Sequence, residues 1–137
     1  MKYTLAVGLT MTRRIDIDTE RTIDFMGDEL RVYATPMMAR DIEIACRDLV
    51  FEHLDDGEDT VGARIEVDHL GATLLDSWVD ITVTIVDIDG RRVTLESDVK
   101  DPLDAVGKAR HVRFVIDVER QKQRLETKTA KLKEDGG

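Results

Sequence analysis

The chain has 137 residues, of which 42% are hydrophobic and 36% are charged, and its formal net charge is −9. This length and composition indicate one soluble globular domain with a modest core. The acidic balance argues against nucleic acid as a partner, because phosphate binding needs a basic surface. A single cysteine, Cys46, excludes an internal disulfide framework and a cysteine metal cluster. The apolar runs are far too short for a membrane span and no signal peptide is visible, so we expect a cytoplasmic protein without a membrane partner, a metal or another cofactor.

The N-terminal part is expected to form one strand followed by a polar segment. Apolar residues alternate over residues 5–11 and recur at Ile15 and Ile17, which predicts a strand within residues 3–17 that ends near Arg13. Residues 18–31 are mainly polar and contain the turn signal Gly27-Asp28. We interpret them as a loop or short helix that is able to act as a lid.

Residues 36–54 are predicted to form the long helix around which the chain is organised. Apolar residues recur there at helical spacing, as Met38, Ile42, Ala45 and Leu49. Thr35 precedes Pro36, a pairing typical of a helix N-cap followed by a first-turn proline. Glu43 lies at the edge of the apolar stripe rather than on the solvated face. This placement makes Glu43 a candidate for chemistry.

Four strands are predicted after an acidic turn at residues 55–59, which lacks the ligand spacing of a calcium loop. They span residues 61–70, 77–88, 92–100 and 105–117, and Asp89-Gly90 is a strong hairpin signal between the second and third. In the first of them, parity places five residues on the interior face: Val61, Ala63, Ile65, Val67 and His69. One strand, one helix and a four-stranded antiparallel meander predict an α+β hot-dog fold, in which an antiparallel sheet of about five strands wraps a long central helix.

The sequence is divided into a hot-dog domain, residues 1–118, and a charged C-terminal helical tail, residues 119–137. Around the tail, Val118, Leu125 and Leu132 are seven residues apart. One apolar residue per heptad is too narrow a seam to predict a coiled coil. We therefore favour a solvated helix over a partner contact, and the role of the tail stays open.

Thr35, Glu43 and His69 are candidates for one catalytic constellation. His69 lies at the end of its strand on the interior face, where a sheet wrapped around the helix would bring it near Glu43, with Thr35 at the helix mouth. Burial raises the pKa of a carboxyl group and a nearby imidazolium lowers it, so such a pair is able to work as acid and base near neutral pH. Spacing alone leaves two simpler interpretations open, in which His69 is a satisfied core residue and Thr35 is only a cap.

Several short stretches match one known family in order and spacing. They are Tyr33-Ala34-Thr35-Pro36 with Glu43 eight residues after Thr35, Val61-Gly62, Val67-Asp68-His69-Leu70, the hairpin over residues 86–93, Gly107, His111-Val112-Arg113 and Asp117. Over about residues 5–120 the chain thus resembles the fluoroacetyl-CoA thioesterase-like branch of the hot-dog superfamily. The resemblance implies hydrolysis of an acyl-CoA thioester by a Thr/Glu/His set, in a homodimer whose active sites lie near the subunit interface.

The resemblance also implies a role for each matched residue. Thr35 would orient the Glu43 carboxylate or the thioester carbonyl, Glu43 would be the general base or the nucleophile, and His69 would assist proton transfer. Gly62 matches a family glycine near the acyl group, where a missing side chain lets the backbone approach a ligand. Arg113 matches a family arginine that suits a carbonyl or a phosphate of coenzyme A. A structural salt bridge is the alternative for Arg113.

The acyl group and the role of His111 are not determined by the sequence. Residues 26–31 are more polar than the apolar lid on which the family's preference for fluoroacetate depends, so fluoroacetyl specificity is not carried over and acceptance of fluoroacetyl-CoA stays open. The main alternative function is a non-catalytic acyl-CoA or small-molecule binding protein of the same fold. A hot-dog enzyme of another kind, such as a dehydratase or an acyl-carrier-protein thioesterase, is the third hypothesis.

Overall fold

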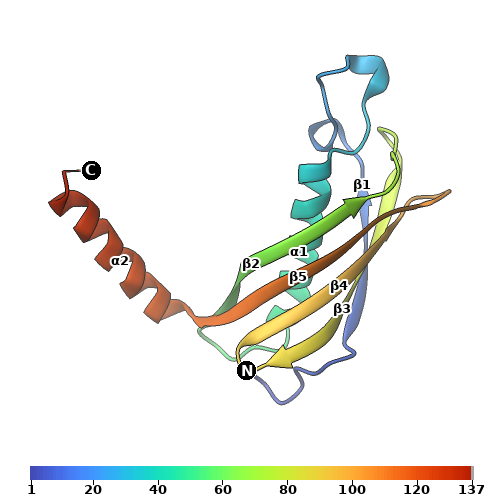
Figure 1. Ribbon diagram of the computed structural model, residues 1–137. Coiled ribbons are helices and arrows are strands. Elements are labelled where there is room, and N and C mark those ends of the chain that lie inside the picture. Colours follow the sequence, from blue (N-terminus) through green and yellow to red (C-terminus); the bar gives the residue numbers. More distant parts are fainter. Residues whose placement is uncertain (137) are drawn as a thin grey trace.

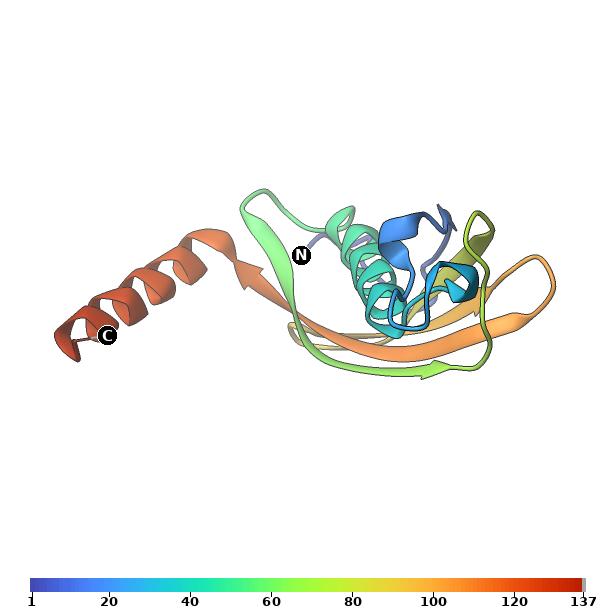
Figure 2. The same ribbon diagram turned by 90° about the horizontal axis from the view of Figure 1, so that it is seen from above.

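The computed structural model describes residues 1–136, in which one long helix lies against the concave face of a five-stranded antiparallel sheet (Figures 1 and 2). The order is β1 (Thr10–Asp16), the 3₁₀ helices η1 (Thr19–Arg21) and η2 (Asp28–Leu30), α1 (Thr35–Phe51), β2 (Glu58–His69), β3 (Trp78–Asp89), β4 (Arg92–Lys100), β5 (Ala105–Asp117) and α2 (Val118–Glu134). The predicted α+β hot-dog architecture is confirmed.

The order of the strands corrects the predicted four-stranded meander. The sheet runs β1-β3-β4-β5-β2, so only β3, β4 and β5 form a meander, and β2 pairs with β5 instead of β3. The reason is the helix that joins β1 to β2. At a rise of about 1.5 Å per residue, α1 carries the chain across the concave face and places these two strands at opposite edges of the sheet.

The start of α1 differs from the prediction. Ala34, in an extended conformation, is the N-cap, and Thr35 is the first helical residue, so the assignment of Thr35 as N-cap is wrong. Pro36 still occupies the first turn, where its missing N–H costs nothing. The helix ends at Phe51, three residues before the predicted end. The Thr35 hydroxyl is therefore not used to cap α1.

The apolar residues of α1 and β3 form the centre of the core. Four residues of β3 that alternate toward α1 are fully buried, as predicted: Val79, Ile81, Val83 and Ile85. β4 and β5 have the predicted bounds. The turn between β3 and β4 is confirmed at Asp89-Gly90, where Gly90 has a φ of +60°. β1 begins at Thr10 and extends beyond the predicted end at Arg13 to Asp16.

A β-bulge in β2 changes which residues face the helix. The register of β2 against β5 shifts between Gly62 and Arg64, and one extra residue reverses the facing of all residues on one side of it. The predicted interior position of His69 lies beyond the bulge and is confirmed by its partial burial. Val61 and Ala63 are exposed, so their predicted interior positions are wrong. Gly62 instead faces α1.

The predicted C-terminal helix is confirmed up to Glu134 as α2, whereas Gly137 lies outside the described residues. The Asp117 carboxylate caps α2 by accepting a hydrogen bond from the Arg120 N–H at 3.0 Å. α2 leaves the end of β5 and extends away from the sheet, and none of its residues is buried (Figures 1 and 2). Over residues 1–136, neither α1 nor α2 has the length and apolarity to cross a membrane.

Candidate active site

Thr35 and His69 meet at one end of α1. The Thr35 Oγ1 lies 2.7 Å from the His69 Nδ1, a hydrogen bond between the first residue of the helix and the last residue of β2. The Tyr33 ring packs edge-on against the imidazole, with ring centroids 6.2 Å apart. The other imidazole nitrogen, Nε2, is buried and has no hydrogen-bond partner among the described residues. His69 is thus oriented through one nitrogen, while the second is able to serve a ligand.

The proton on this histidine depends on the direction of the Thr35 bond. If the Thr35 hydroxyl donates to Nδ1, then Nε2 carries the proton and donates; if Nδ1 donates, then Nε2 accepts. Burial lowers the pKa of His69 below its ordinary value, which favours the neutral ring at pH 7. A neutral imidazole has one donor and one acceptor and is suited to proton transfer in either direction.

Glu43 lies two turns further along α1 and has different neighbours. Its Oε1 is 3.5 Å from the Arg113 Nη1, and its side chain is 49% exposed. Gly62 of β2 lies beside this pair. A Cβ at Gly62 would be 3.3 Å from the Glu43 Oε1, 3.3 Å from the His111 Cε1 and 3.4 Å from the Arg113 Nη1. The absence of a side chain at Gly62 therefore keeps room beside the carboxylate. The family resemblance implies that the acyl group of the substrate lies near this glycine.

Arg113 is held rigidly from β5. Its side chain is only 5% exposed. It donates from Nε to the Thr60 Oγ1 at 2.7 Å and from Nη2 to the Thr60 carbonyl at 2.9 Å. Its Nη1 lies 3.1 Å from the His111 Nε2 and also faces Glu43. Arg113 forms a salt bridge, which the sequence analysis gave as the alternative to substrate binding. Its partner in this salt bridge is Glu43, the candidate catalytic carboxylate.

His111 acquires a role from this arrangement. Its Nδ1 lies 2.8 Å from the Arg64 carbonyl, so Nδ1 carries the proton and donates, and Nε2 is left to accept from Arg113. Burial lowers the pKa of His111, which keeps the ring in this neutral form. His111 therefore positions Arg113. Thr60 was missed by the sequence analysis, since a threonine at the start of a strand carries no signal for an arginine anchor.

The described contacts place the predicted residues in two separate groups. Thr35 and His69 form one, and Glu43, Gly62 and Arg113 form the other. Thr35 and Glu43 are eight residues apart on one helix, which corresponds to about 12 Å at 1.5 Å per residue. No hydrogen bond or salt bridge within residues 1–136 joins Glu43 to Thr35 or His69. A catalytic set of Thr35, Glu43 and His69 therefore stays a prediction.

The sequence as a whole matches the family model of FlK, the fluoroacetyl-CoA-specific thioesterase, over residues 17–119. This match covers well over half of the chain. The chain belongs to the FlK family. It is accordingly an acyl-CoA thioester hydrolase of hot-dog fold.

Individual relatives agree with this assignment. The fluoroacetyl-CoA thioesterase of Streptantibioticus cattleyicolor is 28% identical over 136 residues, covering 94% of this chain and 98% of the relative. A threonine-to-serine mutant of FlK in complex with acetyl-CoA has a TM-score of 0.83 at 26% identity, covering 91% of this chain and 99% of that chain. A thioesterase superfamily member from Thermus thermophilus has a TM-score of 0.87 at 21% identity over 96% and 98% of the two chains, which shows the fold alone.

The segment before Thr35 is tied to α1 by a buried carboxylate that the sequence analysis missed. Asp41, with a side chain only 2% exposed, accepts from the Arg21 Nε at 2.9 Å, the Arg21 Nη2 at 3.1 Å and the Tyr33 hydroxyl at 2.5 Å. Burial and the Asp41 charge raise the pKa of Tyr33, so its hydroxyl stays a donor. In this FlK-family chain, Asp41 thus fixes the ring that packs against His69. In the segment before Thr35, the large apolar residues Phe25, Met26 and Leu30 are exposed.

Cys46 is excluded as a nucleophile. It is fully buried one turn beyond Glu43, and this burial raises its pKa to about 12. The thiol is therefore protonated at neutral pH, and only a thiolate attacks a thioester effectively. The remaining candidates for the hydrolytic chemistry are carboxylate, hydroxyl and imidazole groups.

Proposed function

We propose that this protein hydrolyses a small acyl-CoA by means of Thr35, Glu43 and His69, with Gly62 and Arg113 at the substrate. The observation that carries the proposal is the 2.7 Å hydrogen bond between Thr35 and His69, because it leaves a buried imidazole nitrogen unpaired beside the start of α1. Glu43 supplies the missing charged group. Its carboxylate is half-exposed and lies 3.5 Å from the Arg113 guanidinium.

In the proposed reaction, the Glu43 carboxylate removes a proton from water as the water oxygen bonds to the thioester carbon. Direct attack by the carboxylate, followed by hydrolysis of the anhydride, is the second route. Charge develops on the carbonyl oxygen, which the positive end of the α1 dipole and the Thr35 hydroxyl stabilise. The carbon–sulfur bond then breaks, and the proton that Glu43 took from water passes through His69 to the departing coenzyme A thiolate, which returns Glu43 to the carboxylate and His69 to the neutral ring. The products are a carboxylic acid and free coenzyme A.

We also propose a homodimer joined at the edge strand β2. Within residues 1–136, β2 pairs on one side only, with β5, so the outward-directed N–H and C=O groups of alternate residues along this 12-residue strand are available to a second copy. Glu43 lies beside this edge through its approach to Gly62. Since Thr35 and Glu43 of one chain are about 12 Å apart, they do not reach the same acyl carbon. The proposal is that the partner's Glu43 completes the site of Thr35 and His69.

Mixed dimers test both halves of this proposal. Glu43→Gln and His69→Asn protomers are expected to be inactive alone. Co-expressed and purified as a heterodimer through two different tags, they form one intact site if Glu43 acts across the interface, and about half of the wild-type kcat returns. If Glu43 acts within its own chain, both sites remain defective. Recovery below a few per cent would reject the shared site.

The non-catalytic alternative is distinguished by turnover. Wild-type protein is assayed with a panel of short acyl-CoA thioesters and, in parallel, for saturable binding of the matching thioether analogues. Hydrolysis well above that of Glu43→Gln supports the enzyme. Saturable binding with turnover no higher than that of Glu43→Gln would replace it with an acyl-CoA binding protein.

A further inference from the structure

The helix α2 is not used by the proposed reaction. Seventeen residues leave the end of β5 and run away from the body, and none of them is buried (Figures 1 and 2). An isolated helix of this length is only marginally stable in water, and tertiary packing is what usually stabilises such helices. A contact that covers part of α2 is therefore expected.

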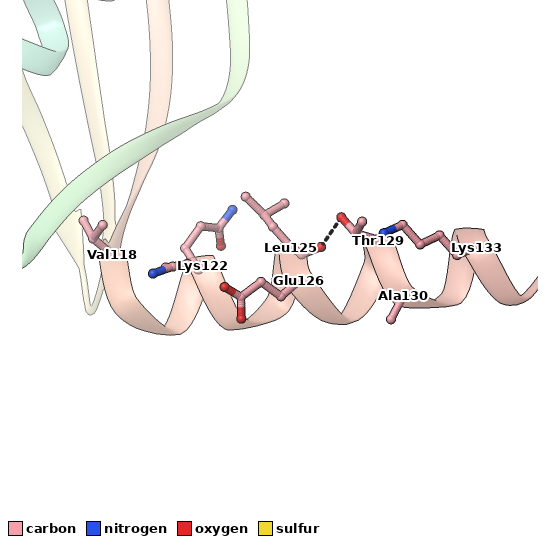
Figure 3. A pocket seen from close by; sticks show the side chains of 8 residues that line it. Val118, Lys122, Leu125, Glu126, Thr129, Ala130 and Lys133 are labelled. Atoms are coloured by element: carbon pink, nitrogen blue, oxygen red, sulfur yellow. Dashed lines mark hydrogen bonds between the residues drawn. The ribbon is translucent and has the colours of Figure 1, made fainter.

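One face of α2 is apolar. Val118, Leu125 and Thr129 project from the same side of the helix and line a shallow groove of about 500 Å³ (Figure 3). Leu125 is 55% exposed, and Leu132, one heptad further, is similarly exposed. The wall of this groove is mainly apolar although charged residues flank it. The stripe is continuous along the helix, since its members are three, four or seven residues apart.

A surface of mixed polar and apolar character connects α2 with the sheet. A second concave region of about 550 Å³ lies where α2 joins the body, and it includes Val61 of β2 and Phe114 of β5, both partly exposed. Arg120 and Arg124 of α2 line its other side. The base of α2 therefore adjoins the unpaired edge strand β2 and exposes both apolar and positively charged side chains there.

The charges of α2 oppose those of the body. Residues 118–134 contain six Lys or Arg and three Asp or Glu, whereas residues 1–117 contain fourteen Lys or Arg and twenty-five Asp or Glu. The helix is thus net positive and the body strongly negative. Its own body is not what α2 covers, because the helix points away from it (Figure 1). A second copy presents the same acidic surface.

We infer that α2 is an arm that packs its Val118, Leu125 and Leu132 face onto the acidic body of a second copy of this chain. A copy that adds to the free edge of β2 lies beside the start of α2, and the arm then reaches over it. Apolar contact supplies affinity, and the charge difference favours the docked orientation. This inference rests on the homodimer proposed above, but it concerns the arm alone, which the mixed-dimer experiment does not test and the α2 variants do.

Thiol accessibility provides a direct test, because Cys46 is buried and its raised pKa makes it unreactive. Leu125→Cys places a thiol on the inferred contact face. Gln123→Cys, the matched control, is about 200° around the helix at 100° per residue. Both proteins are treated with an aromatic disulfide reagent at concentrations above and below the dissociation constant measured by sedimentation. We expect at least tenfold slower labelling at position 125 than at 123, and loss of this protection on dilution.

Three results would overturn the inference. Equal labelling rates at all concentrations would mean a solvated helix. Protection of position 125 that persists in the monomer would mean docking on its own body. The third is a wild-type protein that remains monomeric in sedimentation at all concentrations but binds vesicles of anionic lipid, which would make α2 a membrane-surface helix.

A pair of charge variants provides the second measurement. Leu125→Glu is expected to weaken self-association at least tenfold, while Gln123→Glu, with the same added charge on the other face, stays within twofold of wild type. Since α2 has no buried residue, both proteins are expected to keep the folded body, which circular dichroism verifies. Equal association of the two variants would reject α2 as an interface.

Discussion

The surroundings of Thr35, at the start of α1, differ from those of Glu43, two turns further along the helix. At the first, Thr35 and His69 share a neutral hydrogen bond, and the Tyr33 ring packs edge-on against the imidazole. Two turns later, Glu43 is half-exposed and charged, and faces an arginine that is anchored by Thr60 and His111. The first region is organised to hold a proton and the second to hold a charge. The helix separates the two regions by about 12 Å, and this separation is the reason for the proposal that they meet across a subunit interface.

The charged region is expected to show the largest effect on catalysis. Glu43→Gln keeps the size and hydrogen-bonding shape of the side chain but removes its basicity. We expect kcat/KM to fall about 10³-fold, within the range for loss of a general base. The measurement is thiol release from acetyl-CoA. Retention of more than a tenth of wild-type activity would remove Glu43 from the reaction.

Loss of the buried Asp41 carboxylate of α1 is expected to lower the stability of the fold. In Asp41→Asn, the half-buried Arg21 faces a neutral amide and keeps only its exposed partner Asp18, and Tyr33 loses its charged acceptor. Breaking a buried ion pair costs about 3–5 kcal/mol, so we expect a decrease in the free energy of unfolding of about 3 kcal/mol, measured by urea denaturation. Asp80→Asn is the control. It removes a similar bidentate pair, with Arg14, from the surface, where solvent screening makes the expected loss of stability much smaller. Equal losses would show that burial of Asp41 does not matter.

Filling the space at Gly62 distinguishes the two regions. Gly62→Ala puts a methyl group 3.3–3.4 Å from Glu43, His111 and Arg113, which must shift by a few tenths of an ångström. We expect kcat/KM to fall about tenfold, by analogy with the cost of misplacing catalytic groups. Gly71→Ala, whose new Cβ makes an ordinary 3.5 Å contact with Val106, is expected to stay near wild type. If both variants keep full activity, the close approach at Gly62 has no catalytic role.

The sequence predicted those parts of the molecule that depend on local pattern. Strict alternation and Asp89-Gly90 defined β4 and β5 with their observed bounds, and helical periodicity located α1. His69 was placed correctly on the interior face although two residues of the same alternation were not, because the bulge lies between them. The bulge itself depends on how β2 meets β5, a long-range pairing that no local pattern records.

The contacts of Asp41, His111 and Arg113 were not predicted for a different reason, because their partners come from distant parts of the chain. Asp41 is three residues after Met38 and four before Ala45, inside the apolar stripe, so its burial was visible in principle. Its partners were not, since Arg21 and Tyr33 come from a segment whose polar composition indicates only a loop. His111 and Arg113 alternate on β5 with one residue between them, yet the direction of their contact is fixed by Thr60 and by the Arg64 carbonyl on another strand.

The smallest expected effect is a dependence of stability on mild acid. Burial lowers the pKa of both His69 and His111 in the folded protein, whereas an exposed histidine titrates near about 6.5. Below that pH the unfolded chain binds more protons than the folded one. The stability provided by the neutral rings is therefore complete above about pH 6.5 and is lost as the pH falls toward the folded pKa, by up to about 1.4 kcal/mol per pH unit for each histidine.

Variants at His69 and His111 show how much each histidine contributes to the dependence of the unfolding free energy on pH. Unfolding free energies are compared between pH 6.5 and 5 for wild type, His69→Asn and His111→Asn, because each substitution deletes one titrating group. We expect each variant to have a shallower slope than wild type. Protonation of His111 also removes the acceptor of Arg113 and places a second positive charge beside it. The His111→Asn slope should consequently differ more from wild type than the His69→Asn slope, and an unchanged slope in both would place the acid sensitivity elsewhere in the chain.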